Sequence, residues 1–138
     1  ANPFPFVQKS TVFAMSSISE SMTMSLIEAM VCGTPVVSTD CIAGPREILA
    51  PGSSPQISKT EPEFAPFGVL PPPVGDRMNG SHEPLDESEI VLAHAIKRML
   101  LEPALQKKYT KIGHERARDF DIGPIGSAYR ELLMGDRP

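Results

Sequence analysis

The chain has 138 residues, of which 41% are hydrophobic and 22% charged, and its formal net charge is −4. Such a composition is ordinary for a globular domain. The acidic balance offers no basic surface for nucleic acid, and no apolar run approaches the roughly 18–20 residues of a membrane span. Two cysteines, Cys32 and Cys41, form neither a disulfide framework nor a zinc motif, so a reducing, cytoplasmic setting is expected.

The first 49 residues alternate between strand-like and helix-like patterns. Short apolar runs with β-branched residues predict buried strands at 11–16 and 35–39. Between them, a serine-rich loop at 17–23 and a helix at 24–32 are expected, the helix ending at Gly33. Two buried strands joined by a helix form a β-α-β unit, so the sequence predicts an α/β fold with a parallel sheet.

The remaining chain divides into proline-rich loops and helices. Eight of the 15 prolines fall between positions 51 and 84, which predicts exposed loops at 50–66 and 71–85 around a short third parallel strand at 67–70. Pro45 suits the first turn of a short helix that ends at Leu49. Apolar residues at helical spacing predict further helices in 86–134, with one stripe formed by Leu92, Ala93, Ile96, Met99 and Leu100.

A pair of glutamates, Glu20 and Glu28, is the main functional signal. Ligands of open parallel sheets bind beyond the carboxyl ends of the strands, where the loop at 17–23 must lie. The helix that begins near Met24 directs free N–H groups and a positive dipole end toward the same place, as a phosphate site requires. Carboxylates accept hydrogen bonds from sugar hydroxyls and stabilise positive charge on a sugar ring.

A purely structural interpretation of the same residues stays open at this point. Ser25 and Glu28 have the spacing of a capping box, in which Ser25 is the N-cap of the helix. Glu20 would then be an exposed loop residue. Residue types and spacing alone do not decide between the two interpretations.

An ordered series of short segments carries a family resemblance. Residues 2–49 resemble the C-terminal, donor-binding domain of GT-B-fold glycosyltransferases of the large retaining family 4. The segments that carry the resemblance are 2–6, 12–17, Glu20, 28–30, 32–41 and 44–49, followed by a strand at 67–70 and the final helices at 116–120 and 129–133, with the proline-rich loops as the weak part. The resemblance implies a Rossmann-like parallel sheet flanked by helices, forming part of such a donor domain.

The resemblance also implies roles for individual residues. Glu20 matches the first glutamate of the family's paired-Glu motif, which contacts the donor sugar and is implicated in catalysis. Glu28 matches the second glutamate, which hydrogen-bonds the ribose of the nucleotide. The helix-start residues whose N–H groups receive the donor phosphates match Met24, Ser25 and Leu26.

Two positions of the motif depart from the family pattern. Glycine and then an aromatic residue usually follow the first glutamate, whereas Ser21 and Met22 stand here. Serine restricts positive φ, and methionine fills an aromatic's volume without stacking, so altered donor affinity, sugar preference or activity is expected. Gly44 and Arg46 are further candidates for the donor sugar and a phosphate, with a surface ion pair as the alternative for Arg46.

The implied reaction transfers a sugar, of hexosyl type, from a nucleoside diphosphate to an acceptor hydroxyl with retained configuration. The donor would be a UDP-, GDP- or ADP-sugar, and neither a metal nor another cofactor is expected. The acceptor would be a sugar or lipid-linked sugar of polysaccharide biosynthesis, bound by an N-terminal domain outside this chain. Nine basic and six acidic residues in 91–138 permit a peripheral contact with the inner membrane face.

The chain opens within structured sequence at Ala1, so we expect a segment of a longer protein that is inactive alone. Strands missing from its sheet would leave an edge exposed and favour association. Two alternatives remain. The chain could be a non-catalytic relic or interaction module, or it could belong to a GT-B-fold epimerase or phosphorylase.

Overall fold

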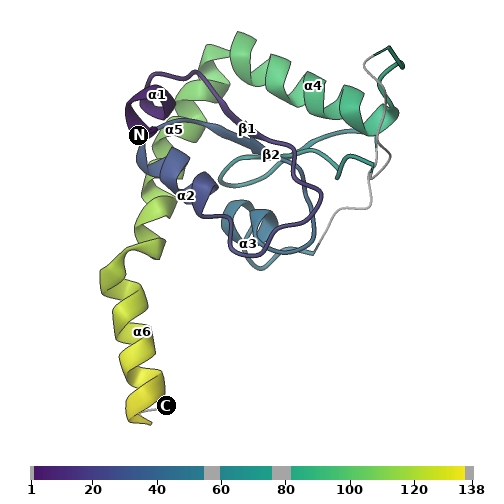
Figure 1. Cartoon of the computed structure of the whole chain (residues 1–138). Helices are drawn as coiled ribbons and strands as arrows, with labels where there is room; N and C mark the ends of the chain where they lie inside the picture. Colours follow the sequence, from purple (N-terminus) through teal and green to yellow (C-terminus); the bar gives the residue numbers. More distant parts are fainter. Residues whose placement is uncertain (1, 55–59, 76–81, 136–138) are drawn as a thin grey trace.

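The computed structural model describes residues 2–54, 60–75 and 82–135, and shows a mixed, four-stranded sheet flanked by helices (Figure 1). The strands lie in the order β1-β2-β4-β3. Three of them are parallel, and the fourth, β3, pairs antiparallel to β4. Their bounds are Phe13–Met15 for β1, Val36–Ser38 for β2, Glu63–Phe64 for β3 and Val69–Leu70 for β4.

The predicted α/β class and the three parallel strands are confirmed, but β1, expected to be buried, has no buried residue, and β3 was not predicted. It lies within 50–66, a range expected to be an exposed loop. Its two residues stand between Pro62 and Pro66, and so short a strand in a proline-rich segment carries no alternating pattern of its own. Phe64 instead packs against α4 (Glu87–Leu101), with the Arg98 guanidinium 4.3 Å from its ring centre.

The predicted helices at 24–32 and Pro45–Leu49 are present, and the range 86–134 is helical as predicted. The helix α2 (Met24–Val31) joins β1 to β2, and Gly33 follows its C-cap with a φ of +77°. The unpredicted first helix, α1, contains a proline, which the first turn of a helix accepts because no N–H is needed there. The other bounds are Phe4–Gln8 for α1, Pro45–Leu49 for α3, Pro103–Ala117 for α5, Arg118–Phe120 for the 3₁₀ helix η1 and Ile122–Met134 for α6.

The helices cover both faces of the sheet, so the core consists of two clusters. Val36 and Val37 are adjacent in β2 and point to opposite faces, one into each cluster. Residues of α2 and α3 pack on the Val36 face, including Leu26, Met30 and Leu49. Residues of α4 and α5 pack on the Val37 face, including Ala95, Met99 and Tyr109.

The apolar stripe of α4 differs from the predicted one. The buried residues are Val91, Ala95 and Met99, whereas Leu100 is exposed. The helix carries two neighbouring rows at spacing of four: the row 91-95-99 is buried, whereas in the row 92-96-100 Leu92 and Ile96 are only partly buried against the same cluster. The periodicity therefore predicts the helix but not its rotation.

The last helix, α6, extends away from the sheet and the other helices (Figure 1). None of the described residues of α6 is buried, and Ile122, Tyr129 and Leu133 are more than 60% exposed. Across residues 2–54, 60–75 and 82–135, no helix combines the length and the apolar character that crossing a membrane would require.

Candidate functional site

The loop that carries Glu20 lies against the chain that follows β2. Ser19 forms a parallel bridge with Ile42, and the Glu20 N–H donates to the Ile42 carbonyl at 3.4 Å. The Thr39 hydroxyl donates to the Ser17 carbonyl at 2.6 Å. The loop is thus held at the carboxyl ends of two adjacent parallel strands, where open α/β sheets bind their ligands.

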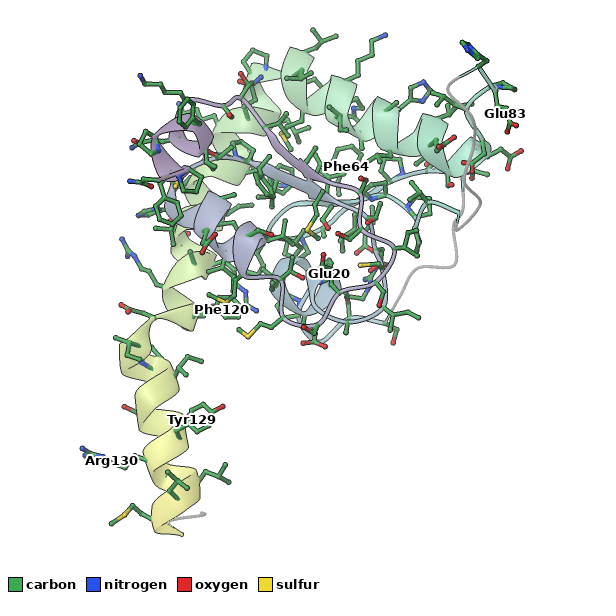
Figure 2. The ribbon with its side chains drawn as sticks, viewed as in Figure 1. Glu20, Phe64, Glu83, Phe120, Tyr129 and Arg130 are labelled. Carbon is green, nitrogen blue, oxygen red and sulfur yellow. The ribbon has the colours of Figure 1, made fainter. Side chains whose placement is uncertain are left out.

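The Glu20 side chain is half-buried in this loop (Figure 2). One of its carboxylate oxygens, Oε1, accepts a hydrogen bond from the Ser17 hydroxyl at 2.6 Å. A hydrogen bond to an ionised acceptor at this distance is among the stronger kinds in proteins. Its exposed neighbours in the loop are Ser21 and Met22, the latter 57% exposed.

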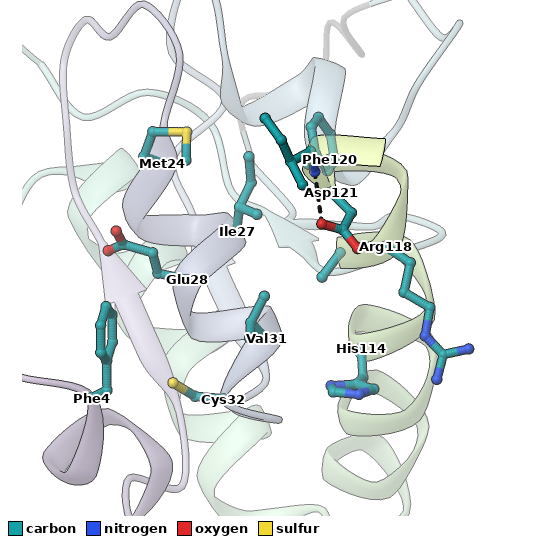
Figure 3. Close-up of a pocket in the computed structure, with 12 residues that line it drawn as sticks. Phe4, Met24, Ile27, Glu28, Val31, Cys32, His114, Arg118, Phe120 and Asp121 are labelled. Atoms are coloured by element: carbon teal, nitrogen blue, oxygen red, sulfur yellow. Dashed lines mark hydrogen bonds between the residues drawn. The ribbon is translucent and has the colours of Figure 1, made fainter. Parts of the chain in front are cut away.

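Glu28 is exposed on α2 and lines a different surface feature. A groove of about 630 Å³ runs between α2 and the segment formed by the end of α5, η1 and the start of α6 (Figure 3). Glu20 is not among its lining residues, so this groove does not bring the two carboxylates together. The lining residues are Phe4, Met24, Ile27, Glu28, Val31, Cys32, His114, Ala117, Arg118, Phe120, Asp121 and Ile122.

The capping box suggested by the sequence is wrong. Thr23, not Ser25, is the N-cap of α2, and no side chain caps this helix. The Ser25 hydroxyl points to the Met15 sulfur at 3.8 Å instead. Glu28 therefore does not cap α2, which was the structural alternative to a role in ligand binding.

The first N–H groups of α2 are partly used within the chain. The Met24 N–H donates to the Met22 carbonyl at 3.0 Å, and the Leu26 N–H donates to the Thr23 carbonyl at 3.1 Å. An anion that received these two groups would have to displace those carbonyls. Among the three residues predicted to receive phosphate, this leaves Ser25 as the simplest donor.

The backbone of Gly44 lies close to the Glu20 loop. Its φ is +87°, and a Cβ at this position would lie 2.4 Å from the Thr23 hydroxyl and 2.5 Å from the Ser21 carbonyl oxygen. The Thr23 hydroxyl is buried and has no hydrogen-bond partner. Gly44 therefore lets the start of α3 pack directly against the residues that precede α2.

Arg46 is committed to an ion-pair network that is nearly buried, since its side chain is 11% exposed. Its guanidinium donates to Asp40 at 2.6 Å, to Glu63 at 2.7 Å and to the Ser53 hydroxyl at 2.9 Å. Burial alone would lower the pKa of Arg46, but the hydrogen bonds to the two carboxylates outweigh it and the pKa is raised. The ion-pair alternative is the one observed, although the pair lies below the surface.

The two cysteines are free thiols, as the sequence predicts. Burial, and to a lesser degree the negative charge of Glu20, raises the pKa of the Cys41 thiol. Within the ranges that the structure describes, no three His, Cys, Asp or Glu side chains cluster as metal ligands would.

Comparisons with known proteins point to one superfamily. Residues 4–61 match the model of the family described as "Glycosyl transferases group 1". The chain is 36% identical over 137 residues to an uncharacterized glycosyltransferase of Methanocaldococcus jannaschii, covering 97% of the chain and 34% of that protein. Together with the α/β fold, these matches relate the chain to the group 1 glycosyltransferases, as the resemblance of its motifs indicated.

Two further likenesses agree with this. Over 134 residues the chain is 26% identical to the N-acetylgalactosamine-N,N'-diacetylbacillosaminyl-diphospho-undecaprenol 4-alpha-N-acetylgalactosaminyltransferase of Campylobacter jejuni, covering 97% of the chain and 30% of that protein. A sucrose-phosphate synthase from Thermosynechococcus elongatus has a similar structure, with a TM-score of 0.62, 26% identity, and coverage of 94% of this chain and 27% of that one. The chain thus spans about a third of the length of these relatives.

Proposed function

We propose that the protein containing this chain is a retaining glycosyltransferase of family 4 and that the chain forms part of its donor site. The observation that carries the proposal is the position of Glu20. Its loop lies beyond the carboxyl ends of β1 and β2 and leads directly into the N-terminus of α2. The same segment falls within residues 4–61, which match the group 1 glycosyltransferases.

In the proposed reaction, the C–O bond between the sugar and the donor diphosphate breaks, and a new bond forms to an acceptor hydroxyl, whose proton passes to the departing diphosphate. The Glu20 carboxylate contacts the donor sugar and stabilises the positive charge that develops on the ring. The N-terminal turn of α2 stabilises the negative charge of the departing diphosphate. Glu28 hydrogen-bonds the ribose hydroxyls.

The donor is a nucleoside diphosphate sugar, with uridine, guanosine or adenosine as the base, and no metal or other cofactor takes part. The exposed side chains of Ser21 and Met22 replace the small and aromatic residues usual in the family. We propose that this exchange alters which sugar is accepted, because methionine adapts its shape to a ligand but cannot stack on it.

The names of the relatives suggest the class of acceptor. The Campylobacter jejuni relative is named for a diphospho-undecaprenol substrate, and a 46-residue match at 39% identity links the chain to a lipopolysaccharide 1,6-galactosyltransferase of Salmonella typhimurium. We propose a lipid-linked sugar acceptor, held by another part of the protein at the cytoplasmic face of the membrane. This chain alone would then not transfer sugar.

A turnover assay with a matched pair of variants tests the proposal. The intact protein is incubated with a panel of sugar nucleotides and lipid-linked acceptors, and release of nucleoside diphosphate is measured. Glu20→Gln keeps the size of the side chain but removes its charge, and should lower kcat by about 10²–10³-fold, as loss of one electrostatic contact to a transition state does.

Glu115→Gln is the control, because Glu115 is an exposed carboxylate of α5. Its turnover should equal that of the unmodified protein. If Glu20→Gln kept full turnover, Glu20 would not have the assigned role. If no sugar nucleotide in the panel were consumed, the assignment as a transferase would be wrong.

A further inference from the structure

Three hydrogen bonds hold the Glu20 loop, one within the loop and two to the chain that follows β2. The Thr39 hydroxyl donates to the Ser17 carbonyl at 2.6 Å, and the Ser17 hydroxyl donates to Glu20 Oε1 at 2.6 Å. The Glu20 N–H in turn donates to the Ile42 carbonyl at 3.4 Å. The Glu20 backbone is therefore bound directly to the chain that follows β2, and the Glu20 carboxylate is linked to that chain through Ser17.

The first partner in this series, Thr39, is part of the core. Thr39 is fully buried, directly after β2, and its own N–H donates to the Met15 carbonyl at 3.0 Å. A β-branched side chain has few accessible χ1 rotamers, and burial at the end of a central strand restricts it further. The hydroxyl that holds Ser17 is thus set by the sheet itself.

Two exposed residues of the loop contrast with this. Ile18 is 53% exposed and Met22 is 57% exposed, so neither anchors the loop by burial. Without the hydroxyl of Ser17, the Glu20 side chain would choose among several rotamers at similar energy. The hydroxyl restricts the carboxylate to one of them.

We propose that Ser17 and Thr39 are positioning residues, which hold the Glu20 carboxylate in the orientation used for sugar transfer. The expected effect on turnover rests on the proposed function, whereas the hydrogen bonds that hold the Glu20 carboxylate do not depend on it. A carboxylate displaced by about 1 Å can cost up to roughly 10²-fold in rate, because stabilisation of a transition state depends on placement. Substrate binding depends on many other contacts and should change little.

The test compares Ser17→Ala with Ser17→Thr in the intact protein. Ser17→Ala should lower kcat by about 10-fold or more and change the KM for the donor less than about 2-fold. Ser17→Thr keeps a hydroxyl and should restore most of the lost kcat. Ser88→Ala is a matched control, since Ser88 also donates to a carboxylate, Asp86 Oδ1, at 2.6 Å but lies at the start of α4.

Crystal structures of the same variants give a readout that does not depend on activity. The Glu20 carboxylate should move in Ser17→Ala and return to its place in Ser17→Thr. Thr39→Val, which keeps the shape of Thr39 without its hydroxyl, should displace Ser17 and Glu20, whereas Thr39→Ser should not.

The outcomes separate this inference from the proposed function. A carboxylate that stays in place in both Ser17→Ala and Thr39→Val would overturn the positioning roles, whatever the activity. If the carboxylate moves but Ser17→Ala keeps full turnover while Glu20→Gln loses it, the orientation of Glu20 does not matter for transfer and the inference is also overturned. Unchanged turnover in Glu20→Gln refutes the assigned role of Glu20 and with it the effect of positioning on transfer, and the crystal structures then decide only whether Ser17 and Thr39 hold the carboxylate.

Discussion

At the scale of single residues, Gly44 is where the Glu20 loop depends most sharply on one side chain. Its φ of +87° disfavours any other residue, and a Cβ would meet the Ser21 carbonyl oxygen at 2.5 Å. Gly44→Ala should therefore lower the free energy of unfolding by about 2–3 kcal/mol, measured by urea denaturation.

Gly52→Ala separates the two causes of that loss. Gly52 has a similar φ of +73°, but no atom lies within 4 Å of a Cβ placed there. Gly52→Ala should lower the free energy of unfolding by about 1 kcal/mol, which is the cost of the left-handed backbone conformation alone. Equal losses in the two variants would show that the contact with Ser21 and Thr23 contributes nothing.

The sequence predicts only those parts of the site whose residues are close together along the chain. Glu20 and Glu28 stand out because a loop and a helix start are visible in the pattern of neighbouring residues. The partners Ser17 and Thr39 were missed as a pair, because their bond joins segments that lie 22 residues apart. The Asp40–Arg46–Glu63 network was missed for the same reason, since Glu63 belongs to an unpredicted strand.

At the scale of elements, Tyr109 links α5 to the sheet. It is buried in the core between α4, α5 and the sheet, and its hydroxyl donates to the Ala65 carbonyl, between β3 and β4, at 2.9 Å. Burial is the main cause that raises the pKa of Tyr109 to about 12. Because the folded chain disfavours the phenolate, stability should fall as the pH rises from about 10, the ordinary tyrosine pKa, through 12.

Tyr109→Phe tests this link. At neutral pH the variant should lose about 1–2 kcal/mol of unfolding free energy, because the Ala65 carbonyl is left without its donor. As the pH rises above 10, the free energy of unfolding should fall less in the variant than in the unmodified chain. Tyr129→Phe, on the exposed face of α6, should show neither effect, and a Tyr109→Phe variant with an unchanged alkaline profile would contradict the account.

Helices and strands were predicted best where their apolar pattern leaves only one face that can pack on the core. The β-α-β unit and α3 follow directly from apolar runs, glycine and proline. By contrast, α4 carries two equivalent apolar rows, and the choice between them depends on packing against β2 and α5. Similarly, Arg116 joins α5 to α3 through the Ile48 and Glu47 carbonyls, at 3.0 and 2.9 Å, a contact between helices far apart in sequence.

At the scale of the whole molecule, two features leave surface without a partner in the described chain. β1 is at one end of the strand order, and α6 extends from the body with its apolar residues exposed. Both are consistent with a chain that spans about a third of the length of its relatives. The exposed edge was expected from the strand count, whereas the projection of α6 was not, because its amphipathic pattern alone predicts a packed helix.

The central claim is that the donor diphosphate binds between the Glu20 loop and the first turn of α2. Hydrogen exchange of the intact protein, with and without saturating nucleoside diphosphate, tests this claim directly. Bound nucleoside diphosphate should slow the exchange of the backbone amides at 20–26 and change exchange little along α4. Unchanged exchange at 20–26, together with protection elsewhere on the molecule, would contradict it.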